Sequence, residues 1–285
     1  MPEEQLASRW LVSTDWLARH LDDPNVVILD GSYYLANAKR DAEAEFLSRH
    51  IPGAQRFDID AISDKSDPLP HMLPSPEQFA AQVGALGVGD GMTIALYDGI
   101  GLYGAARVWF TFRAFGSDRV RVLDGGMPKW KAENRPLEAG PARPRAPKTF
   151  TPRFDRAMVA SIDDVQKVLR DKTAQVVDAR AADRFRGEAP EPRAGLRSGH
   201  MPGSFNVPFG NVLHDGRLAS PETIAAAFKN AGVDLERPVV TSCGSGVTAS
   251  ILTFAIEALG KQQGSVYDGS WSEWGARPDT AVVKG

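Results

Sequence analysis

The sequence is poor in cysteine: its 285 residues contain only one, Cys243. A lone cysteine excludes an intramolecular disulfide and fits a reducing compartment, so we expect the cytoplasm. No apolar run reaches membrane-spanning length, and the acidic start at residues 1–5 lacks the apolar core typical of a signal peptide. We therefore expect a protein with no membrane partner.

The sequence also lacks an excess of either charge, since its formal net charge is −3. Without a strong basic stripe, nucleic acid is excluded as a partner. No cluster with metal-ligand spacing is visible, and a single cysteine does not make a zinc site, so we expect neither metal nor cofactor. The length and an apolar fraction of 42% favour two domains that each bury a core.

Two halves of the chain carry the same pattern. Four anchor residues recur in one order: Asp30, His50, Asp98 and Asp124 in the first half, and Asp178, His200, Cys243 and Asp268 in the second. The first two anchors are 20 residues apart in one half and 22 in the other, and the last two are 26 and 25 apart. The chain is thus predicted to be a duplicated unit, with both histidines and the last aspartate of each half serving structure.

Short β-branched runs predict buried strands in each half, at residues 26–29, 93–97 and 120–123, then 176–177, 239–242 and 265–267. Serines at 13, 75, 161 and 220 each precede a helix-like opening turn, and Pro follows two of them. Strands that alternate with helices indicate an α/β fold, a parallel sheet with helices on both faces. We expect domains at residues 1–138 and 154–285, joined by a proline-rich linker at 139–153.

Cys243 lies where an apolar run ends and the glycine-rich sequence CGSGVT begins at residues 243–248. Backbone N–H groups of such a loop, followed by a helix, favour an anion at the sulfur. The first half has Asp98 at the aligned position, and a carboxylate cannot form a persulfide. Only the second half is therefore expected to be catalytic.

These motifs resemble those of the two-domain rhodanese-type sulfurtransferases along nearly the whole chain. The loop at 243–248, the stretch RFRGEAPEPR at 184–193 and YDGSWSEW at 267–274 look like the branch that uses 3-mercaptopyruvate. The resemblance implies two tandem rhodanese-like domains. It also implies an enzyme that moves sulfur from 3-mercaptopyruvate through a Cys243 persulfide to a thiol acceptor, such as thioredoxin, or to cyanide, releasing pyruvate.

The resemblance also implies the site residues. Arg184 and Arg193 align with a substrate-binding pair whose guanidinium groups suit a carboxylate beside a ketone. Ser245 aligns with a loop serine that is grouped with an aspartate and a histidine of the first domain, here Asp60 and His71. The remaining loop residues expected to contact substrate are Gly244, Gly246, Val247 and Thr248.

Each assignment has a structural alternative. The arginines suit a solvated surface, since arginine is usually exposed. Ser245 suits a turn that bonds its own backbone, Asp60 a turn cap, and His71 packing at an interface.

Other functions remain open as well. A thiosulfate sulfurtransferase has the same fold, but its loop usually carries two basic residues where this chain has Gly244 and Ser245. A phosphatase of a related fold needs an arginine where Ala249 stands. A non-catalytic persulfide carrier needs no arginine pair.

Overall fold

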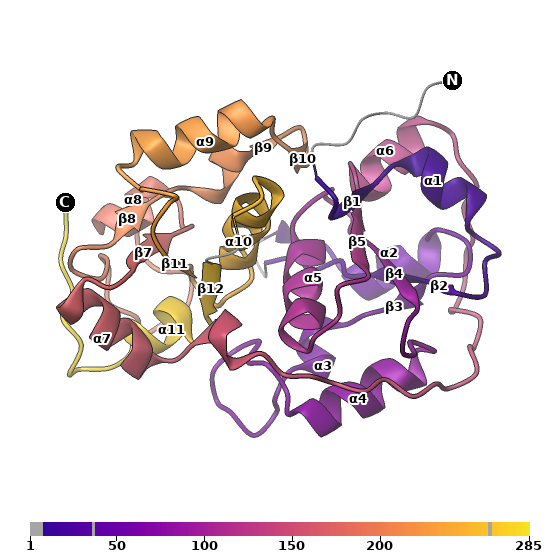
Figure 1. Cartoon of the computed structure of the whole chain (residues 1–285), viewed down its shortest axis with the longest axis horizontal. Coiled ribbons are helices and arrows are strands. Elements are labelled where there is room, and N and C mark those ends of the chain that lie inside the picture. Colours follow the sequence, from indigo (N-terminus) through magenta and orange to yellow (C-terminus); the bar gives the residue numbers. More distant parts are fainter. Residues whose placement is uncertain (1–7, 36–37, 262–263) are drawn as a thin grey trace. The chain divides into compact units, whose positions relative to one another are not determined.

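The computed structural model describes residues 8–35, 38–261 and 264–285, so the acidic start at 1–5 lies outside the described residues. The chain divides into two compact units (Figure 1). The first comprises Met1–Ser63, Leu73–Phe154 and Asp215–Leu218, and the second comprises Asp64–Met72, Asp155–His214 and Ala219–Gly285.

The first unit is built on a five-stranded parallel sheet with strand order β1-β5-β4-β2-β3. Its strands are β1 (Leu11–Val12), β2 (Val26–Asp30), β3 (Gln55–Arg56), β4 (Thr93–Tyr97) and β5 (Val120–Leu123). Its helices are α1 (Thr14–Arg19), α2 (Ala42–Ser48), α3 (Ile59–Ile62), α4 (Pro76–Ala85), α5 (Gly104–Ala114) and α6 (Gly126–Ala132).

Both faces of this sheet are buried. Ala95 and Tyr97 of β4 join a core with residues of α1, α2 and α6, including Trp130. Successive strand residues point to opposite faces, so Ile94 and Leu96 face the other way, and both are almost fully buried. Helices α4 and α5 bring a cluster of phenylalanines to the unit, in which Phe79 and Phe112 meet edge to face.

The second unit repeats this design with strand order β6-β12-β11-β7-β8, again all parallel. The strands are β6 (Val159–Ala160), β7 (Gln175–Asp178), β8 (Phe205–Asn206), β11 (Val239–Ser242) and β12 (Gly264–Tyr267). The helices are α7 (Ile162–Asp171), α8 (Ala182–Arg186), α9 (Pro221–Asn230), α10 (Ala249–Ala258) and α11 (Ser270–Trp274). The second unit also contains the 3-10 helices η2 (Arg156–Met158) and η3 (Phe209–Val212) and the short strand β9 (Leu213–His214), whereas the short strand β10 (Arg217–Leu218) belongs to the first unit.

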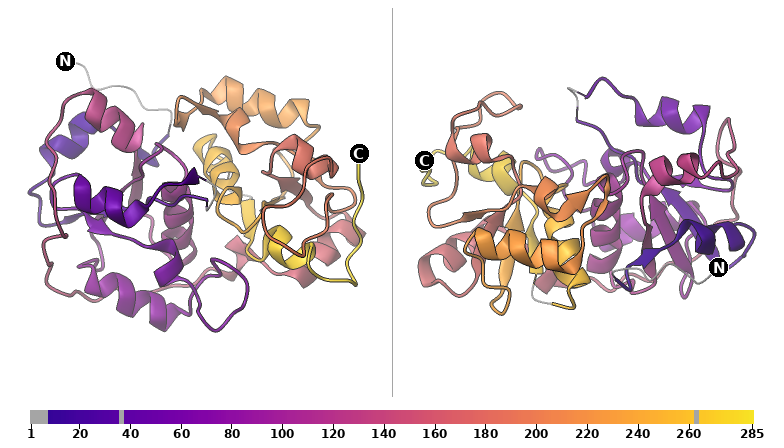
Figure 2. Two further views of the ribbon diagram at one scale, coloured as in Figure 1. Left: turned by 180° about the vertical axis from the view of Figure 1, so that it is seen from behind. Right: turned by 90° about the horizontal axis from the view of Figure 1, so that it is seen from above.

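Strand β11 shows how the second sheet is covered on both faces. Val240 packs into a core with Val165 of α7 and Trp271 of α11. The next residue, Thr241, points the other way, and its hydroxyl is hydrogen-bonded to that of Thr253 in α10 at 2.8 Å. Helices therefore lie on both sides of the sheet, as Figure 2 shows in two further views. The α/β fold and the duplication expected from the sequence are confirmed, since the two strand orders correspond position by position.

The proline-rich segment at 139–153 is extended, as expected, but it lies along the first unit rather than standing apart. The Lys148 N–H donates to the Gly84 carbonyl at 3.0 Å, the Arg153 N–H donates to the Phe115 carbonyl at 2.9 Å, and Phe150 packs edge to face on Phe79. Conversely, Asp64–Met72 belongs to the second unit although it precedes this segment in sequence. The domain boundaries expected from the sequence did not include the packing of Asp64–Met72 with the second unit.

The four predicted helix caps are all formed. Ser13, Ser75, Ser161 and Ser220 each accept a hydrogen bond from a backbone N–H in the first turn of α1, α4, α7 and α9. No helix of the described residues is long and apolar enough to cross a bilayer.

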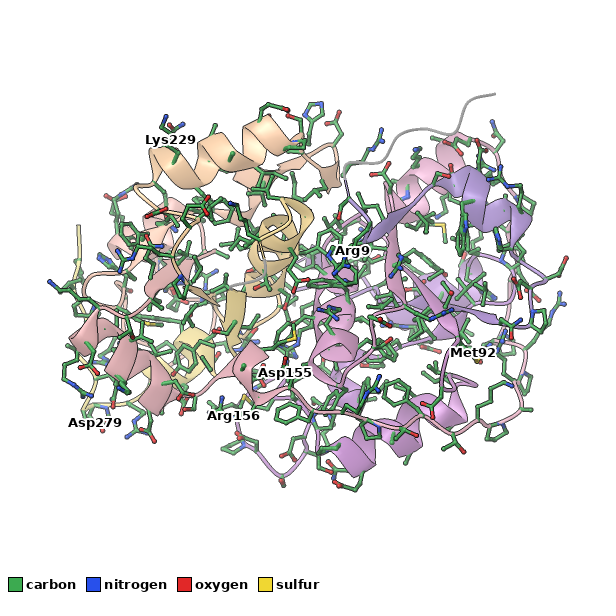
Figure 3. The ribbon with its side chains drawn as sticks, in the orientation of Figure 1. Arg9, Met92, Asp155, Arg156, Lys229 and Asp279 are labelled. Carbon is green, nitrogen blue, oxygen red and sulfur yellow. The ribbon has the colours of Figure 1, made fainter. Side chains whose placement is uncertain are left out.

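The cap of α7 predicts a pH-dependent stability. Asp164 accepts hydrogen bonds from the N–H and hydroxyl of Ser161. Arg156, which is labelled in Figure 3, contacts Asp164 at 2.6 Å. The Ser161 N–H, Arg156 and the Ser161 hydroxyl lower the pKa of Asp164 to about 2. Because the folded pKa is depressed, this stabilisation is present above the unfolded value near 3.8 and is lost as pH falls towards 2.

We therefore expect Asp164→Asn to lower the free energy of unfolding by about 1 kcal/mol at pH 7, after allowance for solvent screening. The loss should shrink as pH falls below 4, when measured by urea denaturation across pH. Asp163→Asn is the matched control, because Asp163 is exposed in the same first turn. Equal losses for the two variants at pH 7 would contradict the capping role.

Candidate active site around Cys243

Cys243 directly follows β11, at the carboxyl end of the central strands of the second sheet. The loop at 244–248 leads from it into α10, and Gly246 has the left-handed φ of +79° that this tight turn requires. The Ser245 N–H points at the Cys243 sulfur, with 3.4 Å between nitrogen and Sγ. Cys243 is only 2% exposed.

The start of α11 is hydrogen-bonded to this loop. The Trp271 N–H donates to the Cys243 carbonyl at 2.9 Å. The N–H and the hydroxyl of Ser272 both donate to the Gly244 carbonyl, at 2.9 and 2.7 Å. Two successive carbonyl groups of the loop, those of Cys243 and Gly244, are therefore fixed by α11.

Both arginines expected at the site reach the residue next to Cys243. A methyl group added at Gly244 would lie 3.3 Å from Nη2 of Arg184 and 4.0 Å from Nη1 of Arg193. A side chain at position 244 would thus take up the space beside the guanidinium groups. Both guanidinium groups therefore lie beside a position that carries no side chain.

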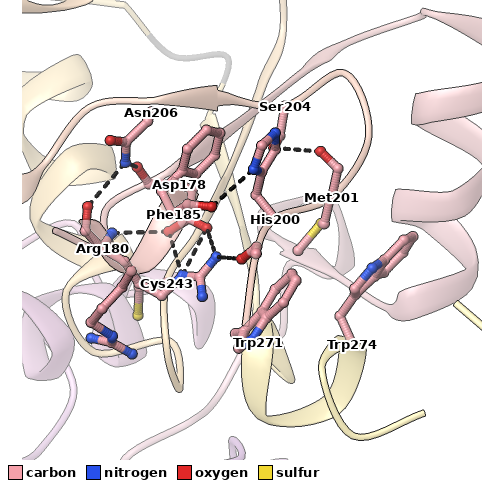
Figure 4. A network of polar contacts seen from close by, with 12 residues as sticks. Asp178, Arg180, Phe185, His200, Met201, Ser204, Asn206, Cys243, Trp271 and Trp274 are labelled. Carbon is pink, nitrogen blue, oxygen red and sulfur yellow. Dashed lines mark hydrogen bonds and ion pairs between the residues drawn. The ribbon is translucent and has the colours of Figure 1, made fainter. Parts of the chain in front are cut away.

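Arg184 is held by a buried network of charges, of which Figure 4 labels Asp178 and Arg180. Its Nε and Nη2 donate to Glu191, whose side chain is 1% exposed, at 3.3 and 2.6 Å. Glu191 also accepts from Nη1 of Arg180 at 2.7 Å, and Arg180 pairs with Asp178 at 2.6 Å. Burial works against the charge of Arg180, but the Asp178 and Glu191 carboxylates outweigh it and raise the pKa of Arg180 above its usual value.

The same network is anchored in the core of the unit. The guanidinium of Arg180 lies over the ring of Trp271, 4.1 Å from its centroid, and donates to the Gly199 carbonyl at 2.8 Å. Asp178 ends strand β7, beside β11 in the sheet. Arg184 is therefore connected through three buried ionic groups to the strand next to Cys243.

His71 belongs to the second unit and contacts Arg193. The Nη2 of Arg193 lies 3.3 Å from Nε2 of His71, and since a guanidinium only donates, the imidazole nitrogen accepts. His71 is 5% exposed and has a left-handed φ of +64°, a strained conformation for a residue other than glycine. Asp60 belongs to the first unit, where it is exposed in α3, so its place in the expected trio with Ser245 and His71 stays a prediction.

The histidines of the repeat, His50 and His200, have structural surroundings. Each donates from Nδ1 to a backbone carbonyl, His50 to that of Phe46 at 2.8 Å and His200 to that of Phe185 at 2.9 Å, and each ring stacks on that phenylalanine. This matches the structural role expected for them.

The first unit shows the same loop with a carboxylate at its centre. Asp98, which is 1% exposed, accepts four backbone N–H groups. The N–H groups of Ile100 and Gly101 donate to Oδ1 at 2.8 and 2.7 Å, and those of Tyr103 and Ala105 donate to Oδ2 at 2.7 and 2.8 Å. The loop geometry of this fold thus directs four donors at a two-atom acceptor.

The rhodanese-like domain model matches this chain twice, at residues 13–133 and 161–277. The chain belongs to the rhodanese family. Each match covers one of the two repeats, so the family expected from the sequence motifs is confirmed.

Full-length relatives support the same conclusion. The chain is 45% identical to a 3-mercaptopyruvate sulfurtransferase of Homo sapiens, over 97% of this chain and 96% of that protein. It is 42% identical to a thiosulfate sulfurtransferase of Cricetulus griseus, over 99% and 97%. The crystal structure of SseA from Escherichia coli, described as a 3-mercaptopyruvate sulfotransferase, superposes with a TM-score of 0.85 at 40% identity and covers 93% of this chain and 99% of its own.

Several residues of this rhodanese site were not found by sequence reasoning. Asp178, Arg180 and Glu191 form the ionic network, and Ser270 and Ser272 contact the loop. The motif at 267–274 was noticed for its resemblance only. Comparison of the repeats carries a signal for Ser270, because the aligned residue of the first repeat is Gly126.

The buried network predicts a stability effect at Glu191. Glu191→Gln removes one carboxylate from a set of two acids and two arginines and leaves a buried positive charge unbalanced. We expect a loss of about 2 kcal/mol in the free energy of unfolding, measured by guanidinium denaturation. Glu188→Gln is the control, because Glu188 pairs with Arg186 on the surface and should leave the free energy of unfolding almost unchanged. If Glu188→Gln costs as much as Glu191→Gln, the network contributes no more than a surface pair.

Proposed function

We propose that this protein is a 3-mercaptopyruvate sulfurtransferase that carries sulfur as a persulfide on Cys243. The observation that carries the proposal is the convergence of Arg184 and Arg193 on Gly244, the residue next to the only cysteine of the chain. The names of the relatives, at 41–45% identity over nearly their whole length, support it.

In the first half-reaction the Cys243 thiolate attacks the sulfur of 3-mercaptopyruvate. A sulfur–sulfur bond forms, the carbon–sulfur bond breaks, and its electron pair goes to the departing carbon as the enolate of pyruvate. Protonation of that carbon gives pyruvate. Arg184 and Arg193 hold the carboxylate and ketone oxygens, where guanidinium groups stabilise the charge that develops on the enolate.

The network around Glu191 has a part in this step. Glu191 accepts hydrogen bonds from one edge of the Arg184 guanidinium, the edge formed by Nε and Nη2. The end edge, formed by Nη1 and the second hydrogen of Nη2, is the one we assign to the substrate carboxylate. An arginine fixed in this way loses little side-chain entropy when the substrate binds.

In the second half-reaction an acceptor thiolate attacks the outer sulfur. The sulfur–sulfur bond breaks and Cys243 leaves as a thiolate, so the cycle closes with no external oxidant. We propose a small thiol or thioredoxin as the acceptor, and cyanide acts in the same way as a nucleophile. The two stages give ping-pong kinetics.

The Asp98 loop of the first unit indicates how the Cys243 loop binds a persulfide, which we call the loaded state. A persulfide, like a carboxylate, offers two acceptor atoms to the loop. We therefore assign the amides of the 244–248 loop to the two sulfurs, and Gly244, Gly246, Val247 and Thr248 to the wall of the substrate site.

We assign Ser245, His71 and Asp60 to proton delivery towards the enolate carbon. The contact of His71 with Arg193 supports a position for the imidazole near the substrate carboxylate. Ser245 lies next to the sulfur through its N–H.

Thiosulfate is the alternative sulfur donor. The chain is 42% identical to a thiosulfate sulfurtransferase, which favours this second candidate function. The loop favours mercaptopyruvate, because Gly244 and Ser245 stand where the thiosulfate-preferring branch usually has basic residues. We expect a higher kcat/KM for 3-mercaptopyruvate than for thiosulfate when both are measured with cyanide as the acceptor. A clear preference for thiosulfate would reverse the assignment.

Cys243→Ser should abolish turnover, because serine cannot form the sulfur–sulfur intermediate. We expect activity to fall by about a thousandfold or more, and no gain of one sulfur atom in the intact-protein mass after exposure to 3-mercaptopyruvate. Wild-type protein should gain that mass and lose it on reduction. Residual activity above about a tenth would contradict a covalent intermediate at this residue.

Arg184→Lys and Arg193→Lys should slow sulfur loading by about tenfold, because an ammonium cannot match two substrate oxygens. Discharge of the preformed persulfide to a thiol should change much less. Single-turnover pyruvate release and persulfide decay measure the two steps separately. Arg186→Lys is the control, since Arg186 pairs with Glu188 on the surface. Equal losses in both steps would remove the substrate-binding role.

A further inference from the structure

Ser270, at the start of α11, has a conformation that serine rarely adopts. Its φ is +49°, in the left-handed region, and its side chain is fully buried. The Ser270 hydroxyl accepts the Cys243 N–H at 3.2 Å and the Gly246 N–H at 3.1 Å, and donates to the Tyr267 carbonyl at 2.8 Å. A strained residue thus supplies one oxygen to two amides of the loop that holds the thiol.

The first repeat provides a comparison for Ser270. Its aligned residue, Gly126, has nearly the same φ of +50° but no side chain. The alignment is sound, because the residue after each makes the same backbone bond: Met127 donates to the Asp98 carbonyl at 3.0 Å, and Trp271 donates to the Cys243 carbonyl at 2.9 Å.

One amide changes partner between the repeats. In the first repeat the Gly101 N–H donates to the Asp98 carboxylate at 2.7 Å. In the second, the aligned Gly246 N–H donates to the Ser270 hydroxyl. No side chain fits at Gly126, because an added Cβ would lie 2.7 Å from the Asp98 carbonyl oxygen.

The difference follows from the number of acceptor atoms. Asp98 has two carboxylate oxygens and takes four amides with them. A bare cysteine has one sulfur, and a persulfide has two. The unloaded loop therefore lacks one acceptor that the Asp98 loop always has.

We propose that Ser270 is a positioning residue that keeps the Cys243 loop formed while no transferred sulfur is bound. Its hydroxyl supplies the acceptor that the outer sulfur provides in the loaded state. This inference rests on the proposed persulfide cycle and goes beyond it, since it assigns a role to a residue that touches neither substrate nor transferred sulfur. Loss of the hydroxyl affects the bare thiol form more than the persulfide form.

The test uses Ser270→Ala and Ser270→Gly in the full chain, with Ser204→Ala as control. Ser204 also donates a hydroxyl hydrogen bond to a backbone carbonyl in the second unit, that of Met201 at 2.7 Å, but in a turn away from the loop (Figure 4). Glycine suits the left-handed conformation, so Ser270→Gly removes the hydroxyl without strain and keeps the test valid if the alanine variant folds poorly.

We expect sulfur loading, followed as single-turnover pyruvate release, to fall by about tenfold in both Ser270 variants. Discharge of the isolated persulfide to dithiothreitol should change by less than about threefold. The rise in Tm on persulfide formation should be larger in the variants than in wild-type protein, because the second sulfur replaces the missing acceptor. Ser204→Ala should match wild type in all three measurements.

Loading at the wild-type rate in Ser270→Gly, or equal losses in loading and discharge, would overturn the role of Ser270. So would a rise in Tm no larger than that of wild type. These outcomes are distinct from a failure of the proposed function, which would show as wild-type protein that gains no sulfur from 3-mercaptopyruvate.

Discussion

The convergence of backbone N–H groups at the carboxyl end of a central parallel strand is the constraint on which both units depend. A sharp turn from β4 to α5, or from β11 to α10, points several donors at one place. Buried donors of this kind need an acceptor, since each one left without a partner costs about 1–3 kcal/mol. The first unit meets the requirement permanently with the Asp98 carboxylate, and the second meets it with sulfur and the Ser270 hydroxyl.

This constraint explains how the duplicated fold can place a carboxylate at the centre of the loop in one repeat and a thiol in the other. The sheet, the helices and the backbone bond from α6 or α11 to the loop are shared by both repeats. The exchange of an aspartate for a cysteine changes the acceptor at the centre of the loop, and the exchange of Gly126 for Ser270 adds a second acceptor. The ionic chain from Asp178 to Arg184 holds a guanidinium beside Gly244, the residue that follows the cysteine.

Local signals in the sequence predicted much of the fold. The apolar runs predicted β4, β5 and β11 to the residue, and the serine caps predicted the starts of four helices, because both signals involve neighbours in sequence. The repeat predicted two similar sheets. The stretch at 184–193 contains three arginines and two glutamates, so the pairing of Glu191 with both Arg180 and Arg184 was not evident from spacing. The placement of Asp64–Met72 in the second unit, and with it His71, depends on tertiary packing that no local pattern reveals.

The choice of serine at position 270 can be argued from magnitudes. A left-handed conformation costs a residue other than glycine about 1 kcal/mol or more, which alone would favour glycine, as at Gly126. The hydroxyl of Ser270 satisfies two buried amides whose combined cost without an acceptor is about 2–6 kcal/mol. Serine is therefore favoured where the loop centre is a single sulfur, and glycine is favoured where a carboxylate already accepts the corresponding amide. Ser270, the first residue of α11, is thus coupled to the chemistry of the Cys243 loop through its hydrogen bond with the Gly246 N–H, 24 residues earlier in the chain.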